Sequence, residues 1–162
     1  MEGYKLNLNM KQQVFSWGDK FWIYDQNGNG KYYVEGEVFS FGKKLHVYDA
    51  NGQEIAYIEQ KILTFLPKYE IYTPEGLAAE VVKDFTFFHQ RYEINGPGWV
   101  VEGDFFDHEY QIMDQSGVIA AVSKEWFTFG DAYEIQVADH VSDSFVLAIV
   151  LVIDACIAAQ RN

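Results

Sequence analysis

The C-terminal end of the chain carries a long apolar stretch that constrains the fold more than any other part of the sequence. Nine consecutive apolar residues, 145–153, precede Asp154, and residues 155–159 continue the apolar character. A helix over 144–160 would be apolar on every side, so the rest of the protein has to surround it. The sequence therefore predicts a hydrophobic core helix at the end of the chain.

A membrane span is the alternative for the same stretch. A spanning helix needs about 20 apolar residues, whereas this run is shorter and is interrupted by Asp154. An Asp near the bilayer centre costs about 2.5–3.5 kcal/mol on insertion scales. We therefore expect no transmembrane segment. Residues 1–10 also lack the apolar run of a signal peptide, so we expect a cytoplasmic protein.

The residues before the apolar stretch repeat a two-strand unit six times. A tripeptide that begins with an aromatic residue or Leu and ends with Ile or Val recurs at intervals of 18 to 24 residues. Short connectors join the two halves of each unit, and turns such as Asn-Gly separate the units, as in β-hairpins. The pattern predicts about twelve strands in a meander. The tripeptides begin at Phe21, Leu45, Tyr69, Tyr92, Tyr110 and Tyr133.

Alternation along these strands separates an apolar face from a mostly polar one. A polar break near the middle of each long strand, such as Glu35-Gly36-Glu37, predicts a bend that keeps Val34 in the core. The polar face collects Ser16, Trp22, Ser40, His46, Thr64, Glu70, Glu93, Gln111, Thr128 and Glu134. The interior face collects Phe15, Trp17, Phe21, Ile23, Phe39, Phe41, Leu45, Val47, Leu63, Phe65, Tyr69, Ile71, Tyr92, Ile94, Phe127, Phe129, Tyr133 and Ile135.

The apolar C-terminal helix and the repeated hairpins fit one architecture. About eight strands already fill a barrel with side chains, so twelve enclose a wider lumen, and the apolar helix is the segment that can fill it. We predict a mainly β (α+β) fold, a twelve-stranded antiparallel closed β-barrel around a central hydrophobic C-terminal α-helix. Residues 1–162 then form a single domain.

Charge and composition exclude several classes of function. The formal net charge is −12, which opposes generic attraction to nucleic acid and to anionic lipid. The single cysteine, Cys156, offers neither an intrachain disulfide nor a zinc-binding cysteine cluster. We expect no cofactor, no metal and no nucleic-acid partner, and we expect a monomer.

Four segments resemble the LURP-one-related family. They are 39–49 (FSFGKKLHVYD), 65–71 (FLPKYEI), 99–105 (WVVEGDF) and 123–131 (SKEWFTFGD). The resemblance covers roughly residues 10–159 and implies a twelve-stranded barrel around a hydrophobic C-terminal helix, related to the Tubby C-terminal domain and to phospholipid scramblases. Tubby relatives bind phosphoinositides and plant members are linked to defence, whereas bacterial members generally lack an established biochemical function. No phosphoinositide-binding motif of these relatives matches positions in this sequence.

One group of basic residues is a candidate binding site. Lys20, Lys43, Lys44, Lys68 and Arg91 all fall in or beside the connectors that join the two halves of the repeat units, so they gather at one end of the predicted barrel. One interpretation of this group is a site for a phosphate or lipid headgroup. The alternative is a set of solvated hairpin tips, because acidic residues share this end.

The other polar residues favour structural roles. The pairs Glu35/Glu37 and Glu102/Asp104 could be catalytic carboxylates or metal ligands, but a repeated bend around a glycine explains them equally well. His46, His89, His108 and His140 show no metal-ligand spacing and are expected to be exposed turn histidines. Asp154 is expected to be a satisfied structural carboxylate near the barrel rim, and Cys156 a small core residue.

These observations favour a non-enzymatic, soluble binding or scaffold protein whose protein partner is unknown. One alternative is a peripheral membrane sensor that binds phosphoinositides or other anionic lipid headgroups through its basic end. Another is a carrier that holds a hydrophobic ligand in the barrel lumen when the helix is displaced. We expect no enzymatic activity, because no nucleophilic triad, P-loop or dinucleotide-binding motif is present.

Overall fold

The computed structural model describes residues 4–12, 20–37, 41–85, 90–125 and 131–160. Within these residues the chain forms twelve strands followed by one helix. The elements are β1 (Tyr4–Gln12), β2 (Lys20–Tyr24), β3 (Gly30–Gly36), β4 (Lys44–Asp49), β5 (Glu54–Lys61), β6 (Lys68–Thr73), β7 (Gly76–Phe85), β8 (Gln90–Asn95), β9 (Trp99–Asp104), β10 (Glu109–Asp114), β11 (Gly117–Glu125), β12 (Asp131–Ala138) and α1 (Asp143–Gln160).

The strands form one antiparallel sheet in which chain neighbours are sheet neighbours from β2 to β12. This arrangement and the C-terminal helix confirm the predicted mainly β fold. β1 pairs with β12 from Tyr4 opposite Ala138 to Gln12 opposite Asp131, but it meets β2 at a single residue pair, Asn9 opposite Tyr24. A continuous ladder does not seal the sheet along this seam, so the closure that the sequence predicted is not confirmed.

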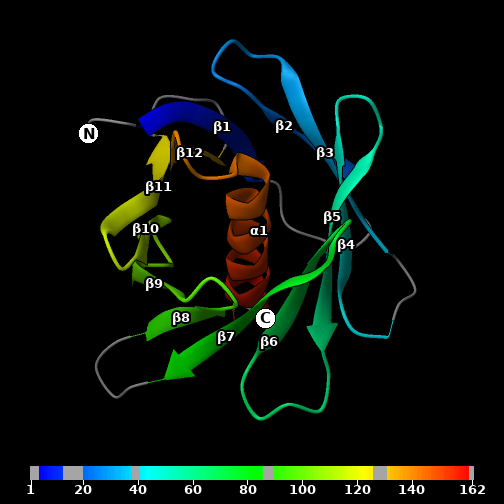
Figure 1. Ribbon diagram of the computed structural model, residues 1–162, viewed down its shortest axis with the longest axis vertical. Coiled ribbons are helices and arrows are strands. Elements are labelled where there is room, and N and C mark those ends of the chain that lie inside the picture. Colours follow the sequence, from blue (N-terminus) through cyan, green and yellow to red (C-terminus); the bar gives the residue numbers. More distant parts are fainter. Residues whose placement is uncertain (1–3, 13–19, 38–40, 86–89, 126–130, 161–162) are drawn as a thin grey trace.

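Helix α1 runs through the middle of the molecule with the strands curved around it (Figure 1). Every residue from Val146 to Ile157 is buried, as an all-apolar helix requires. Ser142 Oγ accepts a hydrogen bond from the backbone N–H of Phe145 (3.3 Å) at the helix start, where side-chain caps satisfy free N–H groups. By length and composition the helix could cross a bilayer, but 67% of it is buried inside the protein.

The predicted interior positions within the described strands are largely confirmed. The buried ones are Ile23, Leu45, Val47, Tyr69, Ile71, Tyr92, Ile94, Tyr133 and Ile135. Phe21 is partly buried and packs against this core. Five predicted interior residues, Phe15, Trp17, Phe39, Phe127 and Phe129, lie outside the described residues.

Three predicted interior residues are exposed instead. Phe41 is 82% exposed, Leu63 100% and Phe65 102%. The prediction was wrong because it extended the strands too far, to Phe41 and Phe65, whereas β3 ends at Gly36 and β5 at Lys61. The residues that follow belong to connectors, where the two-residue alternation of a strand no longer decides which side chains are buried.

The acidic residues of the predicted bend at Gly36 face outward as expected, but no register shift marks a bulge there, because β3 pairs with β4 continuously through Gly36. Val34 is fully buried and Glu37 is exposed. Gly103 adopts φ +144°, and a Cβ at this position would lie 2.5 Å from both the carbonyl oxygen of Glu109 and the Cα of Tyr110. Because any side chain there would collide with β10, the position between Glu102 and Asp104 requires glycine.

Candidate functional site

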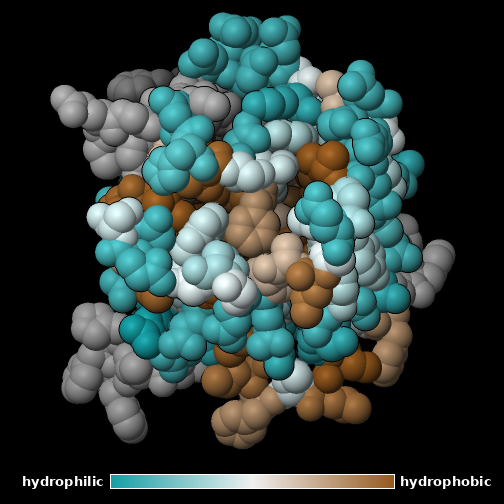
Figure 2. All heavy atoms as spheres, viewed as in Figure 1, coloured by the Kyte–Doolittle hydropathy of each residue, from teal (hydrophilic) through white to brown (hydrophobic). Residues whose placement is uncertain are grey.

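Four exposed apolar side chains gather at one end of the molecule, in the connectors between β3 and β4 and between β5 and β6. We call this group the apolar tip; its members are Phe41, Ile62, Leu63 and Phe65. Figure 2 shows hydrophobic residues along the lower edge of the molecule, where Figure 1 places the β5–β6 connector. Soluble proteins seldom expose contiguous apolar side chains without a binding role, so this end is the candidate functional site.

The two connectors are held against each other by direct contacts. The backbone N–H of Lys43 donates to Gln60 Oε1 (3.1 Å), and the backbone N–H of Gln60 donates to the Lys43 carbonyl (2.8 Å). Gly42 has φ +82°, and a Cβ there would lie 3.1 Å from Ile62 Cγ2. The close approach therefore depends on glycine, and it brings Phe41 beside the β5–β6 connector.

The β5–β6 connector has an unusual backbone conformation. Leu63 has φ +63°, in the left-handed region that non-glycine residues rarely enter. Thr64 Oγ1 donates to the carbonyl of Leu66 (2.8 Å), which folds the connector on itself. Such strain costs on the order of 1–3 kcal/mol and tends to persist at binding sites. Here it holds a fully exposed leucine that makes no contribution to the core.

Lysines border the apolar tip. Residues 41–44 and 61–68 contain four lysines, Lys43, Lys44, Lys61 and Lys68, and no Asp or Glu. Lys61 Nζ lies 3.8 Å from Glu70 and Lys68 Nζ lies 3.1 Å from Glu80, so carboxylates on the strands meet two of the lysines from one side. Lys43 is partly buried, and this burial lowers the pKa of its ammonium group.

The structure divides the five basic residues that the sequence selected. Lys43, Lys44 and Lys68 adjoin the apolar tip. Lys20 instead pairs with Glu35 (3.4 Å), and Arg91 pairs with Asp84 (3.2 Å) and Glu93 (2.9 Å) on the outer face of the sheet. Anion binding by these residues stays a prediction. Sequence reasoning missed Lys61 and the exposed side chains; the signal was the non-alternating segment Lys61-Ile-Leu-Thr-Phe-Leu-Pro-Lys68.

Comparison with known proteins shows the family. A model of the LURP-one-related family matches residues 6–154. This chain belongs to the LURP-one-related family. The uncharacterised protein YxjI of Bacillus subtilis (strain 168) is 38% identical over 149 residues, which span 92% of each protein. The X-ray structure of a protein from Arabidopsis thaliana matches with a TM-score of 0.65 at 15% identity, covering 92% of this chain and 90% of that chain, and shows a shared fold.

This LURP-one-related protein also holds a polar group inside the same end of the sheet. Asp154 of the helix is 6% exposed, and its Oδ1 lies 3.3 Å from His108 Nε2 and 3.3 Å from the Tyr133 hydroxyl. Asp154 is thus a satisfied carboxylate, as the sequence predicted. The prediction that His108 is exposed was wrong: it is 3% exposed, and its ring stacks on that of Tyr133 (centroids 4.1 Å apart).

A lysine is buried near Cys156 of the helix. Lys83 on β7 is 1% exposed, and its Nζ lies 5.9 Å from the ring centroid of Tyr92. Burial lowers the pKa of Lys83 and raises that of the Cys156 thiol to about 11. A thiol with so high a pKa is protonated and unreactive at neutral pH. Cys156 is therefore a core residue, as predicted.

The remaining polar candidates show no catalytic arrangement within the described part of the chain. Glu35 pairs with Lys20, and Glu37 Oε2 lies 3.3 Å from His46 Nε2. Across the residues that the structure describes, no three His, Cys, Asp or Glu side chains group as metal ligands. His140 is exposed as predicted, His46 is half-buried on the outer face, and His89 lies outside the described residues. The apolar tip is thus the feature that most needs a functional explanation.

Proposed function

We propose that this member of the LURP-one-related family is a non-enzymatic binding protein that attaches reversibly to an anionic membrane surface through its apolar tip. The observation that carries the proposal is the full exposure of Leu63 and Phe65 on a connector without acidic residues and bordered by lysines. Apolar side chains surrounded by lysines match a bilayer interface, where lipid tails meet anionic headgroups.

The energy available from this surface fits weak, reversible binding. Burial of one large apolar side chain contributes about 1.5–3 kcal/mol, so Phe41, Leu63 and Phe65 together contribute several kcal/mol. Each lysine near an anionic surface adds about 1 kcal/mol. The net charge of −12 opposes attachment, but charges are screened beyond about 8 Å at physiological salt. Attachment with the tip toward the lipid keeps most carboxylates farther away.

The sheet is the rigid support for this surface, and the proposal includes its closure into a barrel. The strand order returns from β2 to β1, Asn9 lies opposite Tyr24, and the helix is buried over twelve consecutive residues, Val146–Ile157. The expected relationship to Tubby-like domains stays a prediction. Because Tubby relatives bind phosphoinositides, vesicles that contain phosphoinositides should be compared with vesicles that carry other anionic lipids.

Two other hypotheses are outcomes of the same test. A scaffold protein would present the apolar tip to a protein partner, and it would then bind no vesicles. A carrier of a hydrophobic ligand would need to displace the helix from the lumen, which exposes Val146–Ile157 to water. No observation on the described residues favours this displacement.

Co-sedimentation with vesicles tests the proposal. We expect binding to vesicles of mixed phosphatidylcholine and phosphatidylserine, weakened by salt. The double variant Leu63→Ser/Phe65→Ser should lose it, with its stability unchanged because both side chains are exposed. Leu77→Ser is the matched control, since Leu77 is 58% exposed at the start of β7, the opposite end of the sheet. Absence of binding by the unmodified protein, or equal loss in the Leu77 variant, contradicts the proposal.

A further inference from the structure

Six aromatic rings form a continuous row on the outer face of the sheet, across strands β2 to β6. Consecutive ring centroids lie between 4.9 and 6.3 Å apart. We call this row the aromatic belt; in order its members are Trp22, Tyr33, Tyr48, His46, Tyr57 and Tyr72. Trp22 and His46 were predicted to lie on the outer face, but the row itself was not predicted, because it depends on the pairing of strands.

The register of the sheet builds the belt. Trp22 lies opposite Tyr33, Tyr33 opposite Tyr48, and, in the next row, His46 opposite Tyr57 and Tyr57 opposite Tyr72. Tyr48 and His46 are two residues apart on β4 and join the rows. Paired aromatic residues stabilise a sheet by about 0.2–1 kcal/mol each. Stabilisation of the sheet is a sufficient reason for single aromatic pairs. A half-exposed row across five strands, however, also presents a large aromatic surface to solvent.

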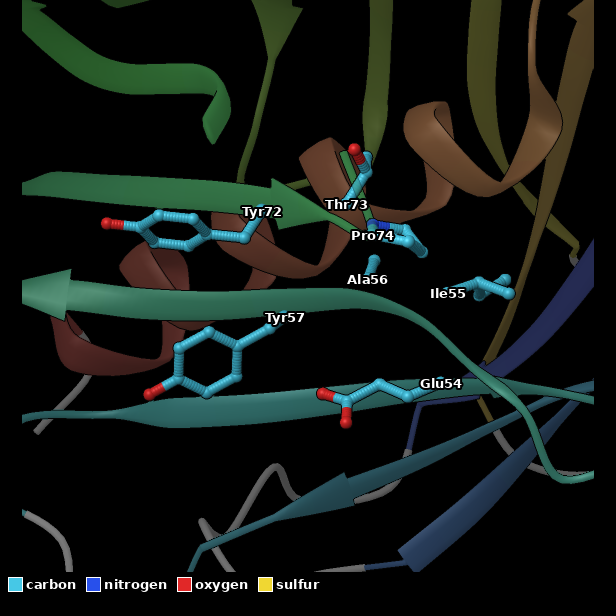
Figure 3. Close-up of a pocket in the computed structure, with 7 residues that line it drawn as sticks. All are labelled: Glu54, Ile55, Ala56, Tyr57, Tyr72, Thr73 and Pro74. Carbon is cyan, nitrogen blue, oxygen red and sulfur yellow. The ribbon is translucent and has the colours of Figure 1, made fainter. Parts of the chain in front are cut away.

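The belt ends at a pocket of about 200 Å³ between β5 and β6. In Figure 3 the rings of Tyr57 and Tyr72 lie next to each other on neighbouring strands with their hydroxyl groups pointing the same way, and the Glu54 carboxylate lies below Tyr57. Ile55, Pro74 and Thr73 complete the lining with Ala56. The pocket therefore combines two aromatic rings, an apolar floor and a carboxylate.

Several carboxylates lie near the pocket, and two of them lack a Lys or Arg partner within the described residues. Glu54 Oε1 and Glu37 Oε2 both contact the ring nitrogens of His46 (2.7 and 3.3 Å), and neither carboxylate pairs with a Lys or Arg within the described ranges. Glu59 lies directly opposite Glu70 on the same face. Like charges opposite each other destabilise a sheet. Lys61 Nζ, 3.8 Å from Glu70, offsets part of this repulsion, and a bound cation would relieve the rest.

The tyrosines respond to the same negative potential. Burial, followed by the charges of Glu59, Glu37 and Glu54, raises the pKa of Tyr57 to about 12. The hydrogen bond from the Tyr72 hydroxyl to Glu70, together with burial, raises the pKa of Tyr72 to about 12 as well. Both phenols are therefore neutral at physiological pH, and both residues line the pocket.

We propose that the pocket lined by Tyr57, Tyr72 and Glu54 binds the guanidinium group of an arginine in a basic, extended segment of a partner protein. A guanidinium stacks on aromatic faces and donates two hydrogen bonds to one carboxylate, so it uses both kinds of group in the pocket. Ammonium groups stack less well and offer no planar pair of donors.

The length of the belt favours a peptide segment over a free small cation. Five neighbouring strands spaced about 4.8 Å apart give a row of about 19 Å, which about six residues of extended chain can follow. Further basic side chains of the segment would then lie along the belt near Glu37 and Glu35. This surface is separate from the apolar tip, because Glu54 and Thr73 lie at the ends of β5 and β6 that are distant from the β5–β6 connector.

Calorimetric titration with an acetylated hexapeptide of alternating arginine and glycine tests the inference. We expect saturable binding that weakens with salt. Replacement of arginine by citrulline, which keeps the shape and removes the charge, should abolish it. Glu54→Gln and Tyr57→Leu should each weaken binding about tenfold, whereas Tyr57→Phe, which keeps the ring, should bind within about twofold of the unmodified protein. Circular dichroism checks that each variant is folded.

The control variant is Glu102→Gln, which removes the same charge from an exposed position on β9. It should bind the peptide unchanged. Equal weakening by Glu102→Gln and Glu54→Gln would show general charge attraction and overturn the site. Binding of the citrulline peptide, or no binding up to about 1 mM peptide, overturns it as well. Free arginine amide that binds as tightly as the peptide would overturn the peptide ligand in favour of a small cation.

Discussion

Replacement of Leu63 by asparagine should make the protein more stable and a weaker membrane binder at the same time. Leu63 has φ +63° and is 100% exposed, so its side chain adds nothing to the core while its backbone is strained. Asparagine tolerates the left-handed conformation better than leucine because its short polar side chain bonds to the local backbone. In the free protein the substitution therefore removes strain without a loss of packing.

The two effects have opposite signs and can be estimated separately. The left-handed conformation costs a branched or bulky residue about 1–2 kcal/mol, so Leu63→Asn should raise the free energy of unfolding by up to about 1 kcal/mol. Loss of the leucine side chain from a lipid interface removes about 1.5–3 kcal/mol of burial, which corresponds to roughly 10- to 150-fold weaker partitioning. A stabilising change that costs binding is expected where strain is retained for function.

Urea denaturation followed by tryptophan fluorescence measures the first effect, and vesicle co-sedimentation measures the second. Leu77→Asn is the control for both, because Leu77 is exposed but is not among the described residues with positive φ. It should leave vesicle binding unchanged and gain no stability. A Leu63→Asn variant that is less stable than the unmodified protein refutes the strain argument. Unchanged vesicle binding refutes the role of Leu63 at the membrane.

Three further predictions concern the interior. Asp154→Ala should lower the free energy of unfolding by about 1–3 kcal/mol, because it leaves the buried side chains of His108 and Tyr133 without their acceptor. Asp154→Asn keeps an acceptor and should cost clearly less; equal losses in urea denaturation would contradict the role of this contact. Gly103→Ala should lower the free energy of unfolding by several kcal/mol, since its Cβ would lie 2.5 Å from backbone atoms of Glu109 and Tyr110. A melting temperature within a degree of that of the unmodified protein would refute the collision. The free energy of unfolding should fall between pH 9 and about 11, because the unfolded chain releases the Cys156 proton that the buried thiol retains. Cys156→Ala should reduce this dependence of stability on pH. An unchanged dependence would show that other groups cause it.

The binding surfaces illustrate how far sequence reasoning reaches. The lysines of the connector end were selected from the sequence, because their position in hairpin connectors is a local property. The apolar side chains between them were assigned to the core, since Phe41 and Phe65 fit the alternation of an extended strand. The alternation of apolar residues does not mark the residue at which a ladder stops; only the loss of alternation over residues 61–68 signals one of the two stops. The stops at Gly36 and Lys61 turned these side chains outward.

The sequence by itself determined the hairpin repeat, the antiparallel order of the strands and the burial of the helix. These follow from patterns within a few residues, the two-residue alternation of strands and an apolar run without a polar face. Only the tertiary structure decided that His108 and Lys83 are buried, that Leu63 and Phe65 are exposed, and that six rings align into the aromatic belt. These features depend on which residues lie opposite one another on neighbouring strands and on where each ladder ends, and both are set by contacts between distant parts of the chain.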